Sequence, residues 1–136
     1  MLPDWPPGTV TILATAGETP HAIPVSAAVR ASPRRVLLGL AVGRGSLARL
    51  RADPRVSLTI IAAEVVVTAH GRAQVLDDAL VEGVTAVEID VHDVQDHDRP
   101  TFAIDNGVRW RWTDAEAERR NGEVRAALTR LAARVR

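Results

Sequence analysis

Most of the first hundred residues alternate between apolar and polar positions with a period close to two. Residues 9–15 and 84–94 show this alternation, whereas residues 36–42 form a nearly unbroken apolar run. A period of two is typical of a strand with one buried face, and a short apolar run fits a strand buried on both faces. The pattern predicts strands over residues 9–15, 21–29, 36–42, 56–61, 64–76 and 84–94.

The short connections indicate how these strands pair. Residues 16–19 contain Gly17 and predict a tight hairpin turn, and residues 31–34 supply the next turn. Only Ala62 and Ala63 separate two of the predicted strands, so we expect an antiparallel hairpin there. Pro24 lacks the N–H that a central strand donates, which places its strand at a sheet edge or a bulge.

The spacing of apolar residues becomes helical in two places. Leu47 and Leu50 follow Ser46 and predict a short helix, capped by this serine and ended before Pro54. The end of the chain is also helical, and Thr113 with Glu116 fits a capping box. Asn121-Gly122 is expected to divide this second stretch into two helices.

Two connections late in the chain complete the pattern. Residues 77–83 predict a helical turn. Asp105-Asn106-Gly107 predicts a hairpin between residues 101–104 and 108–112, because Asn-Gly tolerates the positive φ angles of primed turns. Strands in hairpin succession, with no alternation of strand and helix, favour a mainly β closed antiparallel barrel over an α/β sheet. We expect residues 1–136 to form one domain.

Composition narrows the chemistry. The chain has 136 residues and no cysteine, which excludes disulfides, thiolate metal sites and a cysteine nucleophile. All 17 basic residues are arginine, so Schiff-base chemistry on a lysine is also excluded. The net charge is zero and aromatic residues are scarce, which disfavours nucleic acid as a partner. We find no export signal or membrane span and expect a cytoplasmic protein.

One segment concentrates positive charge. Seven arginines and one acid lie between Arg30 and Arg55. Within this segment a glycine pair precedes the short helix, and backbone N–H groups at such a turn favour an anion. The pattern predicts an anion site near Arg44, Ser46 and Arg49. The alternative is an ordinary capped helix with solvated arginines.

The same region carries a resemblance to a known family. The sequences TVTILAT, HAIPVSAAV and LLGL, followed by the helix-to-strand phrase LRADPRVSL, resemble the pyridoxamine 5'-phosphate oxidase-like family over roughly residues 8–73. This resemblance implies an antiparallel split β-barrel with a short inserted helix and a C-terminal helix. It also implies a homodimer that holds FMN at its interface, with the phosphate near the short helix.

The resemblance assigns residues to this cofactor site. The flavin ring would lie beside the second and third strands, and the phosphate near the short helix. Ser46 stands where the oxidase has a phosphate-binding lysine and Arg44 where it has a serine, so the charge moves to Arg44 or Arg49. The implied cofactor residues are His21, Pro24, Val25, Ser26, Leu40, Ala41, Val42, Arg44, Ser46 and Arg49.

The resemblance implies an FMN-binding oxidoreductase acting on a small molecule. Val66 replaces a glutamine that reaches the flavin, and the Arg-Leu-Pro ending of the oxidase is missing, so pyridoxamine phosphate oxidase activity itself is not expected. No side chain is assigned a catalytic role. The alternatives are a deazaflavin-dependent reductase of the same fold and a cofactor-free binding module.

Two further groups of residues attract attention. Trp110 and Trp112 lie two apart and would share one face of a strand. Trp110 either stacks on a flavin across the dimer interface or, with Trp112, caps the barrel. Residues 92–98 gather two histidines and three carboxylates, which we interpret as a solvated acidic strand edge rather than a metal site.

Overall fold

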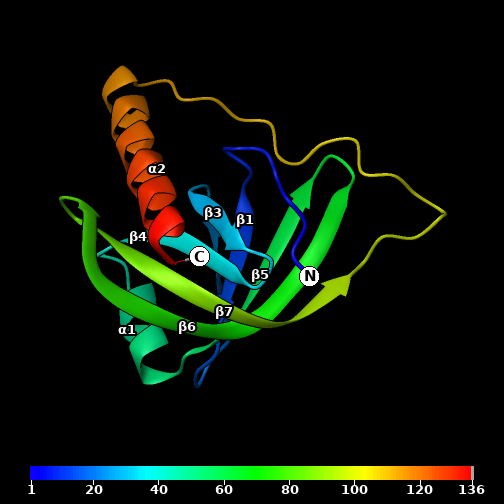
Figure 1. The fold of residues 1–136 in the computed structure, drawn as a ribbon, viewed down its shortest axis with the longest axis horizontal. Coiled ribbons are helices and arrows are strands. Elements are labelled where there is room, and N and C mark those ends of the chain that lie inside the picture. Colours follow the sequence, from blue (N-terminus) through cyan, green and yellow to red (C-terminus); the bar gives the residue numbers. More distant parts are fainter. Residues whose placement is uncertain (136) are drawn as a thin grey trace.

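Seven antiparallel strands form one curled sheet in the order β2-β1-β5-β6-β7-β4-β3 (Figure 1). The structure is a computed structural model that describes residues 1–135, without the side chains of Asp78 and Val135. Its strands are β1 (Thr11–Thr15), β2 (His21–Val25), β3 (Ala28–Ser32), β4 (Arg35–Ala41), β5 (Arg55–Ala62), β6 (Val65–Val81) and β7 (Val84–Asp96). The two helices are α1 (Ser46–Ala52) and α2 (Ala115–Val135).

The sheet is a split barrel because its two edge strands follow each other in the chain. β2 and β3 lie at opposite ends of the strand order, yet only Ser26 and Ala27 connect them. The sheet must therefore curl until its edges face each other. The N–H of Gly39 in β4 donates a hydrogen bond to the carbonyl of Ala27 at 3.2 Å, which continues the pairing of β3 with β4 up to the link. The predicted fold class is confirmed.

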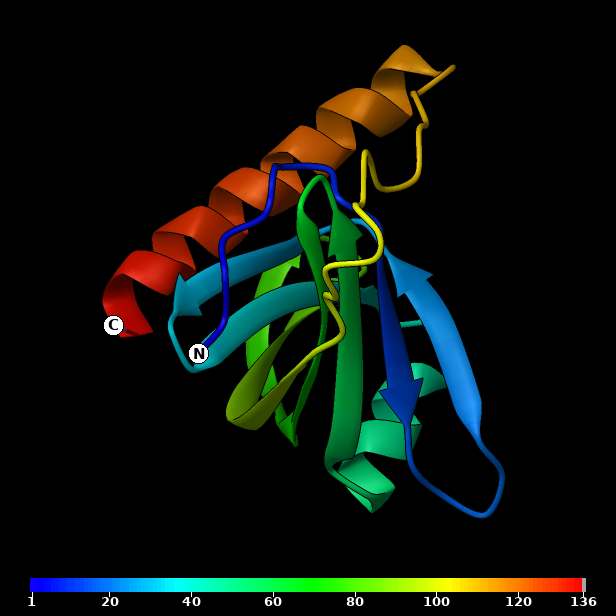
Figure 2. The same ribbon diagram turned by 90° about the vertical axis from the view of Figure 1, so that its right-hand side faces the viewer.

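The inside of the barrel holds the larger of two apolar clusters. Leu13, Leu38, Leu58 and Ile89 are fully buried there, each on a different strand. Helix α1 adds its buried leucines to the same cluster and covers the lower end of the barrel (Figure 2). Trp5 packs against this cluster, and its indole N–H donates to the Ala28 carbonyl at 3.1 Å.

A second apolar cluster lies outside the barrel, beneath α2. Leu37 points away from the barrel interior and meets Leu128, and both are fully buried. The strand over 35–41 is therefore buried on both faces, as its unbroken apolar run predicted. No helix within residues 1–135 combines the length and the apolar composition that a membrane crossing requires.

The second helix differs from its prediction. α2 is one helix of 21 residues, so the division at Asn121-Gly122 is wrong. Glycine in a helix costs about 1 kcal/mol, but the burial of residues that follow it, such as Val124 and Leu128, outweighs that cost. The helix is capped by Asp114, whose carboxylate accepts the N–H of Ala117 at 3.3 Å, and not by Thr113.

Two predicted strand boundaries are wrong. The segment 21–29 is divided at Ser26-Ala27, where the chain leaves one edge of the sheet and enters the other. Pro24 lies on an edge strand, as expected. Residues 77–81 continue β6 instead of forming a helical turn, because Leu80 and Val81 pack against the cluster beneath α2.

Residues 97–114 form no strand, so the predicted hairpin at Asp105-Asn106-Gly107 is also wrong. Instead, this irregular segment crosses the turn between β5 and β6, where the Glu64 N–H donates to the Ile104 carbonyl at 2.9 Å. Gly107 approaches the Ile61 carbonyl so closely that a β-carbon would lie 2.3 Å from its oxygen. Contacts with the turn between β5 and β6 have replaced the hydrogen bonds of a hairpin within the segment.

The contact between α2 and the sheet can be tested at Leu128. Leu128→Ala should lower the free energy of unfolding by about 2–5 kcal/mol, the usual effect of emptying a buried leucine site. The matched change Arg130→Ala, on the exposed side of the same helix, should alter it by less than about 0.5 kcal/mol. Urea unfolding measures both. Equal effects would show that α2 is not packed as described.

Candidate functional site

A pocket opens at the seam of the barrel, where β2 ends beside β4. Its volume is about 290 Å³. We call it the strand pocket. Six of the residues predicted to contact a cofactor line it, and they come from the end of β2, the end of β4 and the turn that follows β4: Pro24, Val25, Ser26, Leu40, Ala41 and Arg44.

Backbone geometry shapes this pocket. β2 stops at Val25, and the next two carbonyl groups turn toward other elements. The Ser26 carbonyl accepts a hydrogen bond from the Arg125 guanidinium at 3.3 Å, and the Ala27 carbonyl accepts one from the N–H of Gly39. Val25 and Leu40 are buried, so the pocket has an apolar floor between fixed backbone groups.

Arg44 supplies the positive charge of the strand pocket. It lies in the turn after β4, where its N–H donates to the Ala41 carbonyl at 3.2 Å. Val42 anchors the same turn by donating to the Gly83 carbonyl at 2.9 Å. Arg44 is exposed, and no residue in the described part of the chain pairs with its guanidinium. This arginine is available to an anion.

Arg49 and Ser46 lie outside the pocket lining. The Nε of Arg49 donates to the Thr15 hydroxyl at 2.9 Å, and its guanidinium also donates to the Thr19 carbonyl. Arg49 therefore ties α1 to the hairpin between β1 and β2. Ser46 is 1% exposed and begins the helix, but Gly45 is the N-cap and no side chain caps it, so the predicted serine cap is wrong.

Two other predicted residues also lie outside the lining. His21 is exposed at the start of β2, at the opposite end of the strand from Val25. Val42 is 58% exposed and flanks the pocket without lining it. The structure thus brings together the ends of the two predicted strands, but not their full length.

The structure brings Trp112, rather than Trp110, to the strand pocket. Asn121 and Val124 of α2 also line it, and none of these three was predicted. The sequence gives little indication of these residues, because their position at the pocket depends on where α2 packs against the sheet. The two indoles meet edge to face, with ring centroids 5.1 Å apart.

No acid or base lines the strand pocket. Its lining contains neither Asp, Glu nor His, so it offers no side chain for general acid–base catalysis. Carboxyl groups with a lowered pKa lie elsewhere: hydrogen bonds from Arg55 lower the pKa of Asp53 to about 2, and a hydrogen bond from Arg119 lowers the pKa of Glu116. Chemistry in this pocket would have to come from a bound group.

The histidines of the outer sheet face are held by hydroxyl groups. Ser57 and His70 share a hydrogen bond of 3.0 Å, and Thr68 and His97 share one of 2.8 Å. Among residues whose side chains the structure describes, no group of three or more histidines and carboxylates could hold a metal ion.

Comparison with solved structures places this fold among known proteins. A candidate pyridoxamine 5'-phosphate oxidase from Listeria innocua has a TM-score of 0.56 at 13% identity, over 65% of this chain and 88% of the other. A FAD-binding protein from Mesorhizobium loti has a TM-score of 0.55 at 20% identity, over 63% and 83%. An F420 reductase has a TM-score of 0.54 at 12% identity, over 65% and 90%.

These similarities define the class of fold as the pyridoxamine 5'-phosphate oxidase-like split barrel and confirm the resemblance inferred from sequence. No protein-family model matches the sequence, and no curated protein matches it significantly. At 20% identity or less, the solved structures establish the fold alone.

Proposed function

We propose that this protein is an FMN-dependent oxidoreductase that acts on a small molecule in the cytoplasm, with the flavin bound in the strand pocket. The observation that carries the proposal is the meeting of Val25, Ser26, Leu40 and Ala41 with Arg44 in one pocket. The neighbours named for FAD, F420 and pyridoxamine 5'-phosphate oxidase share the fold and support a cofactor of the flavin type.

The residues present fit a flavin. A planar ring needs apolar surface on its faces and polar backbone groups near its edge, and the buried Val25 and Leu40 with the backbone at Ser26 and Ala41 offer both. A phosphate needs a cation, and Arg44 can give it bidentate hydrogen bonds. This replaces the larger set of phosphate ligands predicted from sequence, since Arg49 is engaged with its own chain.

The residues of the strand pocket would bind the flavin and orient it. The flavin supplies hydride or electron transfer when bound, and the protein tunes and positions it. Val25 and Leu40 would exclude water from the ring, and Arg44 would fix the phosphate end. Because no side chain in the lining can move a proton at neutral pH, any proton would come from solvent or substrate.

A second subunit would complete the site. The volume of the strand pocket is about 290 Å³. Small-molecule sites usually have volumes of roughly 300–1,000 Å³, so this pocket is small. It cannot enclose a whole FMN alone. Val42 beside it is 58% exposed, and Ile12 is 38% exposed opposite the exposed Pro24 on the outer sheet face. Apolar surface of this kind suits a partner, so we propose a homodimer.

A deazaflavin reductase is the second candidate. The F420 reductase neighbour supports it, because F420 is a deazaflavin with a planar ring like that of a flavin. A cofactor-free binding module is the third candidate. The apolar floor and the arginine fit either cofactor, so binding measurements must separate the three.

The visible spectrum separates these candidates. Purified protein mixed with FMN should retain yellow colour through gel filtration and show shifted flavin bands, because the ring leaves water for an apolar pocket. Retention of F420 but not FMN would support the second candidate. Failure to retain either would contradict the proposal and favour a cofactor-free module.

Arg44 provides the sharper test. Arg44→Ala should weaken FMN binding by about 1.5–3 kcal/mol, the contribution of hydrogen bonds to a charged group. Arg51→Ala is the matched control. Arg51 is exposed on α1 and does not line the strand pocket, so this substitution removes the same charge away from the proposed site. Fluorescence titration of FMN measures both. Equal losses would reject Arg44 as the phosphate ligand.

A further inference from the structure

A larger pocket lies next to the strand pocket. It measures about 610 Å³, and its lining comes from the irregular segment, the N-terminal segment, the turn between β5 and β6, and α2. Trp110 and Trp112 line it from one side and Pro6 and Pro7 from another. We call it the tryptophan pocket.

Specific contacts hold the walls of the tryptophan pocket in place. Trp110 donates its indole N–H to the Gly8 carbonyl at 2.9 Å, a contact across 102 positions of sequence. Gly107 lies against the Ile61 carbonyl, where no β-carbon fits. Irregular connections longer than about 12–15 residues are uncommon in compact domains and are usually functional or disordered. This one is tied down at both points.

The lining of this pocket favours a flat ring. Trp110 and Trp112 are 39% and 36% exposed and meet at 76°, so each still offers surface to a ligand. Aromatic rings prefer offset or edge-to-face contact with other rings. The prolines and alanines opposite add apolar surface without polar groups that a ring would leave unpaired.

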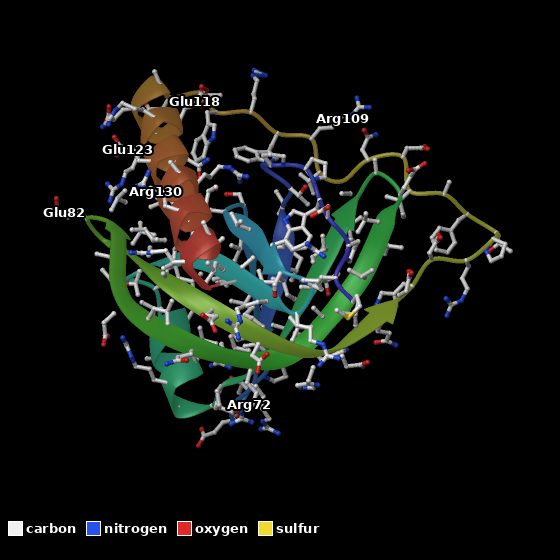
Figure 3. The ribbon with its side chains drawn as sticks, in the orientation of Figure 1. Arg72, Glu82, Arg109, Glu118, Glu123 and Arg130 are labelled. Atoms are coloured by element: carbon white, nitrogen blue, oxygen red, sulfur yellow. The ribbon has the colours of Figure 1, made fainter. Side chains whose placement is uncertain are left out.

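The charge of the lining favours an anion. Three arginines and no carboxylate line the tryptophan pocket. Arg125 is half-buried and uses one nitrogen on the Ser26 carbonyl, and the described residues offer the rest of its guanidinium no further hydrogen bond. Arg109 and Arg111 are exposed, and Arg109 projects from the irregular segment at the rim (Figure 3). The cation inside is therefore Arg125.

The two pockets share a wall. Trp112 and Asn121 line both of them, and Arg125 of the tryptophan pocket is hydrogen-bonded to Ser26 of the strand pocket. A ligand in one pocket would thus lie directly beside a ligand in the other.

We propose that the tryptophan pocket binds a planar aromatic ring that bears a carboxylate, with the ring against the indoles and the carboxylate at Arg125. As a second part, this ligand is the substrate of the oxidoreductase, placed beside the flavin across the shared wall. The substrate role rests on the proposed function, whereas binding itself does not.

Indole N–H signals in a nitrogen-edited NMR spectrum test the binding. The chain contains three tryptophans, and Trp5 lies outside the pocket as an internal reference. Titration with β-naphthoate should shift the Trp110 and Trp112 signals and leave that of Trp5 unchanged. β-Naphthol, which lacks the charge, and cyclohexanecarboxylate, which lacks the aromatic ring, should each bind about tenfold more weakly. Equal binding of all three probes, or no shift at Trp110, would overturn the proposal.

Arg125→Met tests the charge contact. This substitution should weaken the binding of β-naphthoate by about tenfold and leave the binding of β-naphthol unchanged, since one hydrogen-bonded charge is lost. Arg130→Met, on the exposed face of the same helix, is the matched control and should change neither (Figure 3). The ratio of the two probes stays informative even where the variant alters stability. An unchanged ratio in Arg125→Met would reject the contact.

Titrations with and without FMN separate this proposal from the preceding one. Shifts at Trp110 in protein that retains no FMN would support the pocket and contradict the flavin. Retention of FMN without any response to β-naphthoate would contradict the pocket alone. Displacement of β-naphthoate from Trp110 by FMN would show that the tryptophan pocket belongs to the flavin, which overturns its assignment to a second ligand.

Discussion

The curl of the sheet is the constraint on which the rest of the structure depends. Because β2 and β3 are consecutive in the chain yet occupy opposite edges, the sheet can only satisfy the short link between them by wrapping until the edges meet. The Gly39 N–H donates to the Ala27 carbonyl, so the chain begins to pair with β4 as soon as it leaves β2. The edges approach without pairing as strands, and the strand pocket lies at this incomplete closure.

The C-terminal helix converts the seam into a site. Its apolar side packs on the outer face of β3 and β4 (Figure 2), and Asn121 and Val124 line the pocket where β2 ends. Asn121 is thereby brought to both pockets, and Arg125 lines the tryptophan pocket and donates to the Ser26 carbonyl, 99 positions earlier in the chain. Packing of Leu128 and its neighbours thus has a functional consequence, since it holds the polar residues of α2 at the seam.

Sequence patterns predicted the local elements well and the long-range placement poorly. The barrel strands and the doubly buried 36–42 segment followed from periodicity, because burial acts on each strand separately. That Val25, Leu40 and Arg44 lie in one pocket could be predicted only from the family resemblance. The hydrogen bonds of Arg49 could not be predicted, because its partners, Thr15 and Thr19, lie on a hairpin whose approach to α1 leaves no local sequence pattern. The Asn106-Gly107 hairpin failed for the same reason, since tertiary contacts replaced it.

A crystal structure of the protein with FMN tests the central claim most directly. We expect flavin density at the seam, with the ring against Val25, Ser26 and Leu40, the phosphate at Arg44, and a second copy of the chain covering the open side. Flavin density confined to another surface, or a seam filled by the chain's own side chains in crystals grown with excess FMN, would contradict it.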